Sequence, residues 1–326
     1  MMKSDIDVEQ HANVNDAKIP SVSLCLIAKD EEESLPDCLA SVRHLVAEMI
    51  VVDTGSQDGT AQAAFKSGAR VLPFAWSGDF SSARNFALSQ VNSDWILILD
   101  ADERLEPVDP ETFSRLLAND KVEGYYLEIK NHLAPGQSSW DKVVRLFRNK
   151  PCYRFRGAIH EQVAASILEY SGSESLASAP LFIQHAGYTQ EKIESQHKPE
   201  RNMAILKQEL EHNPDDPFLL YCLGLEYYQQ NQVEQGLTCL EQALVQMPGG
   251  EGYLEDVILY LALGYLALGK SEKLEDFIAK CLLMFPEHPD LLGIRGFCRS
   301  QGDKRQEAFS DWQISLTQRL SRMPLD

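Results

Sequence analysis

Apolar and polar positions along the first half of the chain fall into blocks that are typical of strands separated by short helices. Four runs rich in apolar and β-branched residues have the length of buried strands: 22–28, 49–53, 69–74 and 95–100. Between them lie three segments with apolar residues at helical spacing: 31–44, 58–66 and 80–90. Strands that alternate with helices in this way predict a doubly wound, mostly parallel α/β sheet.

The pattern changes after residue 123. Two runs, 125–130 and 143–148, flank a turn region with proline, glycine and serine at 134–139. Residues 153–156 and 181–185 are further strand candidates. We therefore expect an antiparallel extension over the end of the parallel sheet.

From residue 190 onward the chain predicts helices. Small and large apolar positions recur there with the spacing of a tetratricopeptide repeat: Leu220, Leu223, Gly224, Tyr227, Gly236, Leu240, Ala243 and Pro248. Gly236 stands where that repeat usually has alanine, and the pattern restarts near Tyr260 and Leu292. A small residue on each helix lets the paired helices approach closely. We predict a flexible tail at 1–20, an α/β domain at 21–190 and an all-α helical-repeat domain at 191–326.

Composition and charge argue against some classes of ligand and some cellular locations. The 30 basic and 49 acidic residues give a formal net charge of −19, which disfavours nucleic acid as a partner. An anionic nucleotide ligand would need a local cation for the same reason. The seven cysteines are widely spaced without a C-x-x-C pair, which is typical of reduced thiols in the cytosol. The polar first 18 residues do not resemble a signal peptide, and no apolar run is long enough for a transmembrane segment, so we predict a cytoplasmic protein.

Two acidic residues follow the apolar run 95–99. On an extended chain, residues i and i+2 point to the same side, so Asp100 and Asp102 could share one cation or divide a nucleotide between them. Carboxylate oxygens suit Mg²⁺ or Mn²⁺, and such ions bind phosphates with few protein ligands. The alternative is a solvated acidic strand end. A position at the carboxyl end of a buried strand favours the functional interpretation.

A second acidic residue of interest, Asp53, also ends a predicted strand. A turn with glycine and serine and then a helix start follow it, which is a layout typical of nucleotide sites. The Asp53 carboxylate can accept a hydrogen bond from a base N–H or from a ribose hydroxyl. Asp58 and Ser56 have an alternative role as caps of the following helix.

Together these segments resemble family 2 glycosyltransferases of the GT-A fold over about residues 21–190. The resemblance rests on ordered motifs: Ala28-Lys29-Asp30-Glu31, Leu35-x-x-Cys38-Leu39-x-Ser41, Val52-Asp53-x-Gly55-Ser56-x-Asp58-Gly59-Thr60, Ala83-Arg84-Asn85 and Asp100-Ala101-Asp102. The opening motif of the family usually has Asn-Glu where this chain has Asp30-Glu31. A tetratricopeptide-like domain behind such a domain resembles an arrangement known from bacteria.

The resemblance implies a nucleotide-sugar donor, usually a UDP-sugar, and assigns residues to it. Ala28 and Glu31 would lie along the nucleoside, and Asp53 would contact the base. Arg84 would lie near the diphosphate or order the loop before the metal-binding strand. Its planar donor fork suits phosphate, although a salt bridge to an aspartate such as Asp79 is the alternative.

The same resemblance assigns the remaining positions of the site. Asp100 would hold the ribose or the donor sugar, with Ala101 beside it, and Asp102 would bind Mn²⁺ or Mg²⁺. His185 after the run 181–184 is a candidate further metal ligand, with a structural role as the alternative.

The segment Arg156–Glu161 resembles the family segment over the acceptor. Inverting transfer needs a base for the acceptor hydroxyl, and Glu161 is our candidate. A structural hydrogen bond from Glu161 or His160 is the alternative.

We therefore predict a metal-dependent, inverting glycosyltransferase that moves a hexose-type sugar to a protein, a peptide or a cell-envelope glycan. The repeats would recruit a protein partner or mediate self-association. One rival is a non-catalytic scaffold that binds nucleotide-sugars. Another is a nucleotidyl transferase, but such enzymes usually have a glycine-rich phosphate loop, and residues 25–33 contain no glycine.

Overall fold

The computed structural model describes residues 20–134, 137–185, 198–249, 252–302 and 304–321. The chain divides into two compact units, Met1–Ser195 and Gln196–Asp326. The boundary that we predicted between residues 190 and 191 lies outside the described residues, as does the predicted tail apart from Pro20.

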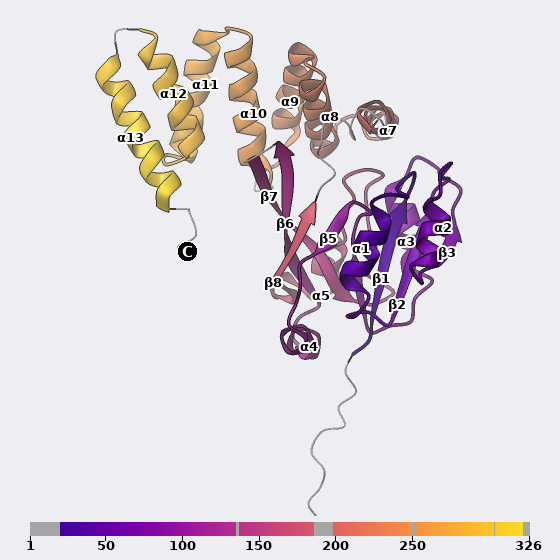
Figure 1. Ribbon diagram of the computed structural model, residues 1–326. Helices are drawn as coiled ribbons and strands as arrows, with labels where there is room; N and C mark the ends of the chain where they lie inside the picture. The colour runs from indigo at the N-terminus through magenta and orange to yellow at the C-terminus, as the bar shows by residue number, and fades with distance from the viewer. Residues whose placement is uncertain (1–19, 135–136, 186–197, 250–251, 303, 322–326) are drawn as a thin grey trace, which may run out of the picture. The chain divides into compact units, whose positions relative to one another are not determined.

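One eight-stranded sheet, in the order β3-β2-β1-β4-β7-β6-β8-β5, forms the first unit (Figure 1). Its strands are β1 (Val22–Ala28), β2 (Glu48–Asp53), β3 (Arg70–Pro73), β4 (Trp95–Ile98), β5 (Glu103–Leu105), β6 (Gly124–Ala134), β7 (Gln137–Arg148) and β8 (Leu176–His185). The first four strands are parallel, whereas β7 is antiparallel to both β4 and β6. The carboxyl ends of β1, β2 and β4 therefore meet at one edge, where a doubly wound sheet binds its ligands.

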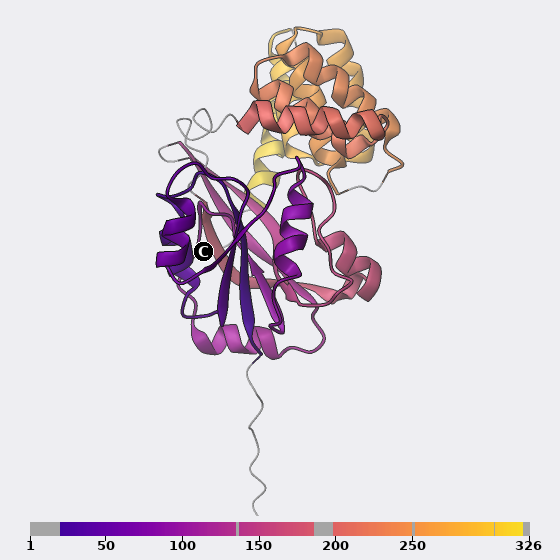
Figure 2. The same cartoon turned by 90° about the vertical axis from the view of Figure 1, so that its right-hand side faces the viewer.

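Helices cover both faces of this sheet (Figure 2). They are α1 (Leu35–Val42), α2 (Thr60–Lys66), α3 (Phe80–Leu88), α4 (Pro110–Ala118) and α5 (Ala164–Ser171). Leu39 of α1 and Phe113 of α4 belong to the core on one face, and Leu88 of α3 and Ile167 of α5 to the core on the other. The strands β1, β2 and β4 are buried almost throughout, as expected for parallel strands that are covered on both faces.

The strand predicted at residues 153–156 is wrong. Only Arg156 forms a bridge, to Gln162, whereas the N–H of Arg154 and both polar backbone groups of Phe155 bond to side chains. The Arg154 N–H donates to Ser166 Oγ at 3.0 Å. The Phe155 N–H and C=O both bond to the Asn85 amide, at 2.9 Å each. A backbone whose polar groups are satisfied by side chains has no need of a neighbouring strand.

The second unit consists of helices in its described part. They are α7 (Lys198–His212), α8 (Pro217–Gln229), α9 (Val233–Gln246), α10 (Leu254–Ala267), α11 (Ser271–Met284), α12 (Pro289–Ser300) and α13 (Arg305–Ser321). Successive helices contact each other, and α9, α10, α11 and α12 share one apolar core. The predicted order, an α/β domain followed by an all-α domain, is thus confirmed. Within the described residues, none of the helices combines the length and apolar composition that a membrane span requires.

The unusual glycine of the first repeat, Gly236, has a steric explanation. A Cβ added at Gly236 would lie 2.3 Å from Cδ1 of Tyr228 and 2.8 Å from the Gly224 carbonyl oxygen. Gly224 lies on the partner helix α8, so α8 and α9 approach at two glycines. The alanine that is usual at this position would force these helices apart.

We expect Gly236→Ala to lower the free energy of unfolding by about 1–3 kcal/mol because of this overpacking. The matched control is Gly293→Ala in α12, where a Cβ would meet only Ser315 Oγ, at 3.7 Å. A helical glycine with room for a methyl group gains about 0.5–1 kcal/mol on replacement by alanine. Urea unfolding followed by circular dichroism measures both, and equal effects of the two substitutions would contradict the steric explanation.

Candidate active site

Two neighbouring strand ends carry the residues predicted to hold the nucleoside. Ala28 of β1 and Asp53 of β2 are register partners. Oδ1 of Asp53 accepts hydrogen bonds from the backbone N–H groups of Gly55 and Ser56, at 3.0 and 2.8 Å. The Asp53 carboxylate therefore shapes its own turn with one oxygen. Among the described residues Oδ2 has no hydrogen-bond partner, and it stays available to a ligand.

The loops that follow β1 and β2 are tied together through Asp30. Its backbone lies in the left-handed region, at φ 55°, which aspartate and asparagine tolerate better than most residues. Its Oδ1 accepts from the Gln57 N–H at 2.6 Å, and its own N–H donates to Ser56 Oγ at 3.1 Å. Glu31 also joins the two loops, since its N–H donates to Thr60 Oγ1 at 2.7 Å. Asp30, which stands where the family usually has asparagine, thus bridges the two loops.

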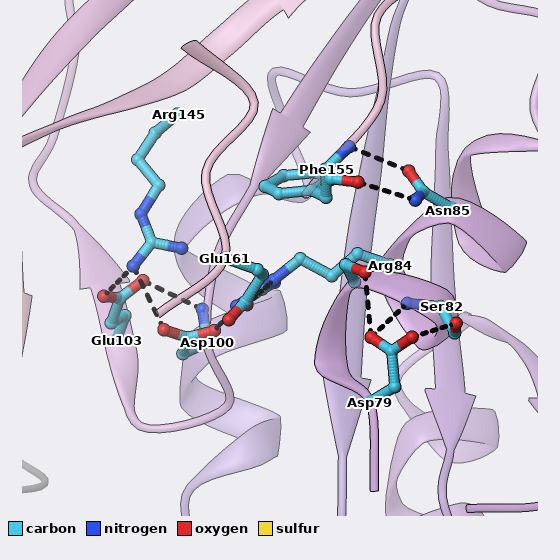
Figure 3. Close-up of polar contacts among 10 residues, drawn as sticks. Asp79, Ser82, Arg84, Asn85, Asp100, Glu103, Arg145, Phe155 and Glu161 are labelled. Carbon is cyan, nitrogen blue, oxygen red and sulfur yellow. Dashed lines mark hydrogen bonds and ion pairs between the residues drawn. The ribbon is translucent and has the colours of Figure 1, made fainter. Parts of the chain in front are cut away.

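Helix α3 presents Arg84, which is buried. Asp79 begins this helix as its cap and accepts from the Ser82 N–H at 3.0 Å. Asp79 is therefore not the ion-pair partner that we considered for Arg84. Arg84 Nη2 instead donates to Asp100 Oδ1 at 2.7 Å, and Arg84 Nε donates to Glu161 (Figure 3).

The strand from which we predicted a common side for the two aspartates is shorter than expected. The strand ends at Ile98, and Ala101 and Asp102 lie in a turn, so the alternation of an extended chain does not apply. Asp100 faces the two buried arginines, Arg84 and Arg145, whereas Asp102 faces His185. The two carboxylates of the motif therefore have different ion-pair partners.

Sequence reasoning missed the second of these arginines, Arg145 on β7. Its Nη2 donates to Asp100 Oδ2 at 3.0 Å and to Glu103 Oε1 at 2.7 Å, while Glu103 Oε2 accepts from the Asp100 N–H at 2.8 Å (Figure 3). Arg145 and Glu103 are both buried. The sequence contains one indication of this role, because Arg145 is the single charged residue in the apolar run 143–147. A charged residue that is buried requires a partner.

The charges in this network act strongly on one another. Burial alone raises the pKa of Asp100, but Arg145 and Arg84 outweigh it and hold that pKa well below its usual range. Glu103 is buried more completely, and burial together with the Asp100 charge raises its pKa to about 7 although Arg145 opposes this. Asp100 is therefore a fixed anion between two cations.

Three strands place His185 beside Asp102. Its Nε2 lies 3.4 Å from Asp102 Oδ1, and its Nδ1 lies 2.8 Å from Asn131 Oδ1. Asn131 Nδ2 donates to Asp141 at 2.7 Å, which turns the amide oxygen toward the imidazole. Nδ1 must then carry the hydrogen, and Nε2 is directed at Asp102. A metal-binding histidine is usually held in this way by an acceptor behind it.

Asp102 and His185 bring together a carboxylate and an imidazole, two groups that a divalent ion can bind. Among the described residues no group of three or more His, Cys, Asp or Glu side chains is arranged to hold a metal by itself. Mg²⁺ and similar ions at phosphate sites take one or two protein ligands and complete their shell with phosphate and water. Without an ion, burial lowers the pKa of His185, but the hydrogen bond and charge of Asp102 outweigh this and raise it.

A short loop presents Glu161 to a cavity of about 230 Å³. The loop is closed by two backbone hydrogen bonds of 3.1 Å between Arg156 and Gln162, and it passes through left-handed backbone at Gly157 and His160. The polar lining of the cavity consists of Arg84, Asp100, Arg145, His160, Glu161 and Gln162. Burial lowers the pKa of His160, although the charge of Glu161 opposes this. The cavity thus joins a guanidinium–carboxylate network to an imidazole.

Known proteins match both units of the chain. Residues 23–162 match the model of Glycosyl transferase family 2. A TPR repeat-containing protein of Synechococcus elongatus is 36% identical over 77% of this chain and 62% of its own length. The prophage-derived glycosyltransferase SunS of Bacillus subtilis is 24% identical over 74% of this chain and 58% of its own length. The chain thus spans about three fifths of the length of these curated relatives.

Two further similarities cover smaller shares of the chain. The lipopolysaccharide core biosynthesis glycosyltransferase LpsC of Rhizobium meliloti is 32% identical over 45% of this chain and 57% of its own length. A crystal structure of glucosyl-3-phosphoglycerate synthase from Mycobacterium tuberculosis, with Mn²⁺ and UDP-glucose, is 17% identical. That likeness covers 57% of this chain and 77% of the other, at a TM-score of 0.40, which is too low to carry a functional argument.

Proposed function

We propose, from the premise that residues 23–162 form a glycosyl transferase family 2 domain, that this chain transfers a sugar from a nucleotide-sugar to an acceptor hydroxyl. The observation that carries the proposal is the network of Arg84, Asp100 and Glu161 beside the Asp102–His185 pair. The network provides a positioned carboxylate, and the pair provides ligands for a cation, at the edge of the sheet where such domains bind ligands.

The donor site extends from β1 and β2 to the end of β4. Ala28, Glu31 and Asp53 lie along the nucleoside in this proposal, with Oδ2 of Asp53 accepting from the base. We assign uracil as the base, and hence a UDP-sugar as the donor. Asp100 accepts from a hydroxyl of the ribose or of the donor sugar, and Ala101 lies beside it. Because Arg84 and Arg145 keep Asp100 ionised, it is a strong acceptor for such a hydroxyl.

Asp102 and His185 are the residues that would hold Mn²⁺ or Mg²⁺. The ion would neutralise charge that develops on the departing diphosphate. Two observations support this assignment: Asn131 holds the imidazole of His185, and Asp102 is largely buried. The acidic character of the chain makes such a cation more important, since the carboxylates of the site otherwise repel a diphosphate.

Glu161 is the proposed base in an inverting displacement. One of its oxygens accepts from Arg84 Nε, which fixes the plane of the carboxylate and leaves the other oxygen for the acceptor hydroxyl. Arg84 also holds Asp100, so one side chain sets the base relative to the donor site. Such positioning of reacting groups contributes substantially to rate.

We expect Glu161→Gln to lower the rate of transfer by about 10²–10⁴-fold, because the amide cannot take the proton. Donor affinity should stay unchanged, since glutamine keeps an oxygen for Arg84. The matched control is Glu169→Gln, which alters a surface pair with Arg156 and should leave the rate unchanged. Wild-type turnover in Glu161→Gln, with donor bound normally, would remove Glu161 as the base.

The proposal also specifies the class of the donor sugar and the class of the acceptor. We infer a hexose-type sugar and, as acceptor, either a cell-envelope glycan or a protein or peptide. The relative LpsC, named for lipopolysaccharide core biosynthesis, supports the glycan class. A helical-repeat domain of the kind named in the Synechococcus relative supports a protein. Nucleotide-sugars are cytosolic metabolites, and we place the activity in the cytoplasm.

A screen of UDP-, GDP- and dTDP-sugars, with and without Mn²⁺, tests the proposal. We expect a UDP-hexose to raise the unfolding temperature when Mn²⁺ is present and much less without it. Release of UDP on slow hydrolysis of the donor should follow the same dependence. Binding without any release of UDP would favour a scaffold that only binds nucleotide-sugars, and the absence of binding by every donor would overturn the proposal.

A further inference from the structure

Strands β6, β7 and β8 lie side by side (Figure 1), and aromatic and charged side chains share one face of them. We call this set the open face, and it consists of Glu128, Lys130, Trp140, Lys142 and Phe182. Residues that alternate with them along the strands, Leu127, Ile129 and Ile183, are buried on the opposite face. The sheet thus has a core on one side here and a polar, aromatic surface on the other.

Two aromatic side chains form the apolar part of the open face. Trp140 is 53% exposed and Phe182 is 36% exposed. Their ring centroids lie 6.4 Å apart, with the ring planes nearly perpendicular at 82°. Because the two rings contact each other across strands, they form one surface instead of two isolated apolar groups. A ligand that covers this surface gains the free energy of burying it.

The open face continues into the cavity that contains Glu161. Val144 lines that cavity, and Lys142 and Trp140 are the next residues on the same side of β7. At the rise of an extended strand, Lys142 lies about 7 Å and Trp140 about 13 Å along β7 from Val144. A ligand with one end at Glu161 therefore has to be extended to reach Trp140.

The open face carries two lysines that lie over aromatic rings. Lys130 Nζ lies 5.5 Å from the centroid of the Trp140 ring, and Lys142 Nζ lies 5.8 Å from that of Tyr126. Within the part of the chain that the structure describes, neither lysine forms an ion pair, although Glu128 is the register partner of Lys142. The whole chain has a net charge of −19, so most of its surface repels an anion and these two cations attract one.

We propose that the open face binds the acceptor, and that the acceptor is an oligosaccharide with a negatively charged sugar unit. That unit stacks on Trp140, since the electron-rich face of an aromatic ring attracts the C–H groups of a sugar. Its carboxylate or phosphate pairs with Lys130 and Lys142, and Glu128 accepts hydrogen bonds from its hydroxyls. The inference rests on the proposed function and narrows its acceptor to a charged glycan.

Isothermal titration calorimetry of the full chain with three disaccharides tests this inference. They are cellobiose, cellobiouronic acid and cellobiose phosphorylated on its non-reducing glucose. At an ionic strength of about 0.01 M we expect at least one charged disaccharide to bind about 5-fold or more tighter than cellobiose, and the difference to shrink at about 1 M. The tighter of the two charged disaccharides identifies a carboxylate or a phosphate as the preferred anion.

Two substitutions separate stacking from charge. Trp140→Ala should raise the dissociation constants of all disaccharides that bind by about 10-fold or more. Lys142→Gln should raise those of the charged disaccharides by about 5-fold and leave that of cellobiose unchanged. The matched controls are Phe65→Ala and Lys66→Gln, which replace an exposed aromatic residue and the exposed lysine beside it on α2. Both controls should bind like the wild type.

Circular dichroism establishes that each variant is folded. The inference is wrong if neither charged disaccharide binds more tightly than cellobiose, or if folded Trp140→Ala keeps the wild-type dissociation constants. Binding of hexaglutamate as tight as that of the charged disaccharides would overturn it in favour of an acidic protein or peptide. Release of UDP from the donor by the wild type tests the transfer reaction separately, because hydrolysis of the donor requires no glycan acceptor.

Discussion

Replacing Asp102 by asparagine is expected to lower kcat/KM of sugar transfer by about 10³-fold, which corresponds to about 4 kcal/mol of transition-state stabilisation. The substitution keeps the size of the side chain but removes the charge that would bind the cation. It also leaves His185 with a neutral neighbour at 3.4 Å. Initial rates measured over a titration of Mn²⁺ should show a raised requirement for the ion.

The matched control for this prediction is Asp37→Asn. Asp37 is an exposed aspartate of α1 that pairs with Arg104 on the surface. Its neutralisation changes the net charge by the same amount and should leave the rate and the Mn²⁺ requirement unaltered. If Asp102→Asn keeps both at wild-type values, the carboxylate has no part in binding the metal.

Replacing Arg145 by methionine is expected to lower the free energy of unfolding of the first unit by about 3–5 kcal/mol. Methionine preserves much of the apolar stem but leaves Glu103 buried without its cation, and Asp100 keeps only Arg84. Urea unfolding followed by tryptophan fluorescence reports mainly on this unit, because three of the four tryptophans, Trp76, Trp95 and Trp140, lie in it.

Two comparisons isolate the cause of this loss. The double variant Arg145→Met with Glu103→Leu removes both charges, and it should recover much of the stability because no buried ion stays unpaired. Arg104→Met breaks the exposed pair with Asp37 and should cost at most about 1 kcal/mol. Equal losses in Arg145→Met and Arg104→Met would show that burial of the pair contributes little.

The parallel half of the sheet could be predicted from the sequence, because the apolar residues within each segment specify its strand. Buried parallel strands are continuous apolar runs, and the predicted run 22–28 coincides with β1. The first helix begins at Leu35, four residues after the predicted start, since Asp30 takes a left-handed backbone and residues 32–34 form a turn. The helical repeats were visible for the same reason: each small residue is required by a helix nearby in sequence.

The parts that could not be predicted depend on contacts between distant segments. Arg145 lies 45 residues from Asp100, and nothing in either segment specifies the other. The run 153–156 has the composition of a strand, but Asn85, 70 residues from Phe155, and Ser166, 12 residues from Arg154, take its hydrogen bonds. The roles of Asp53, Asp102, His185 and Glu161 stay predictions, and the substitutions above are their test.

The hydrogen-bond chain from Asp141 through Asn131 to His185 has a practical consequence. Since Asp141 sets the orientation of the amide, and the amide sets which ring nitrogen carries the hydrogen, the electron-donating strength of the imidazole is controlled from outside the pocket. In the proposed metal site, a substitution at position 141 would therefore change the ion preference without replacing any residue that would touch the ion.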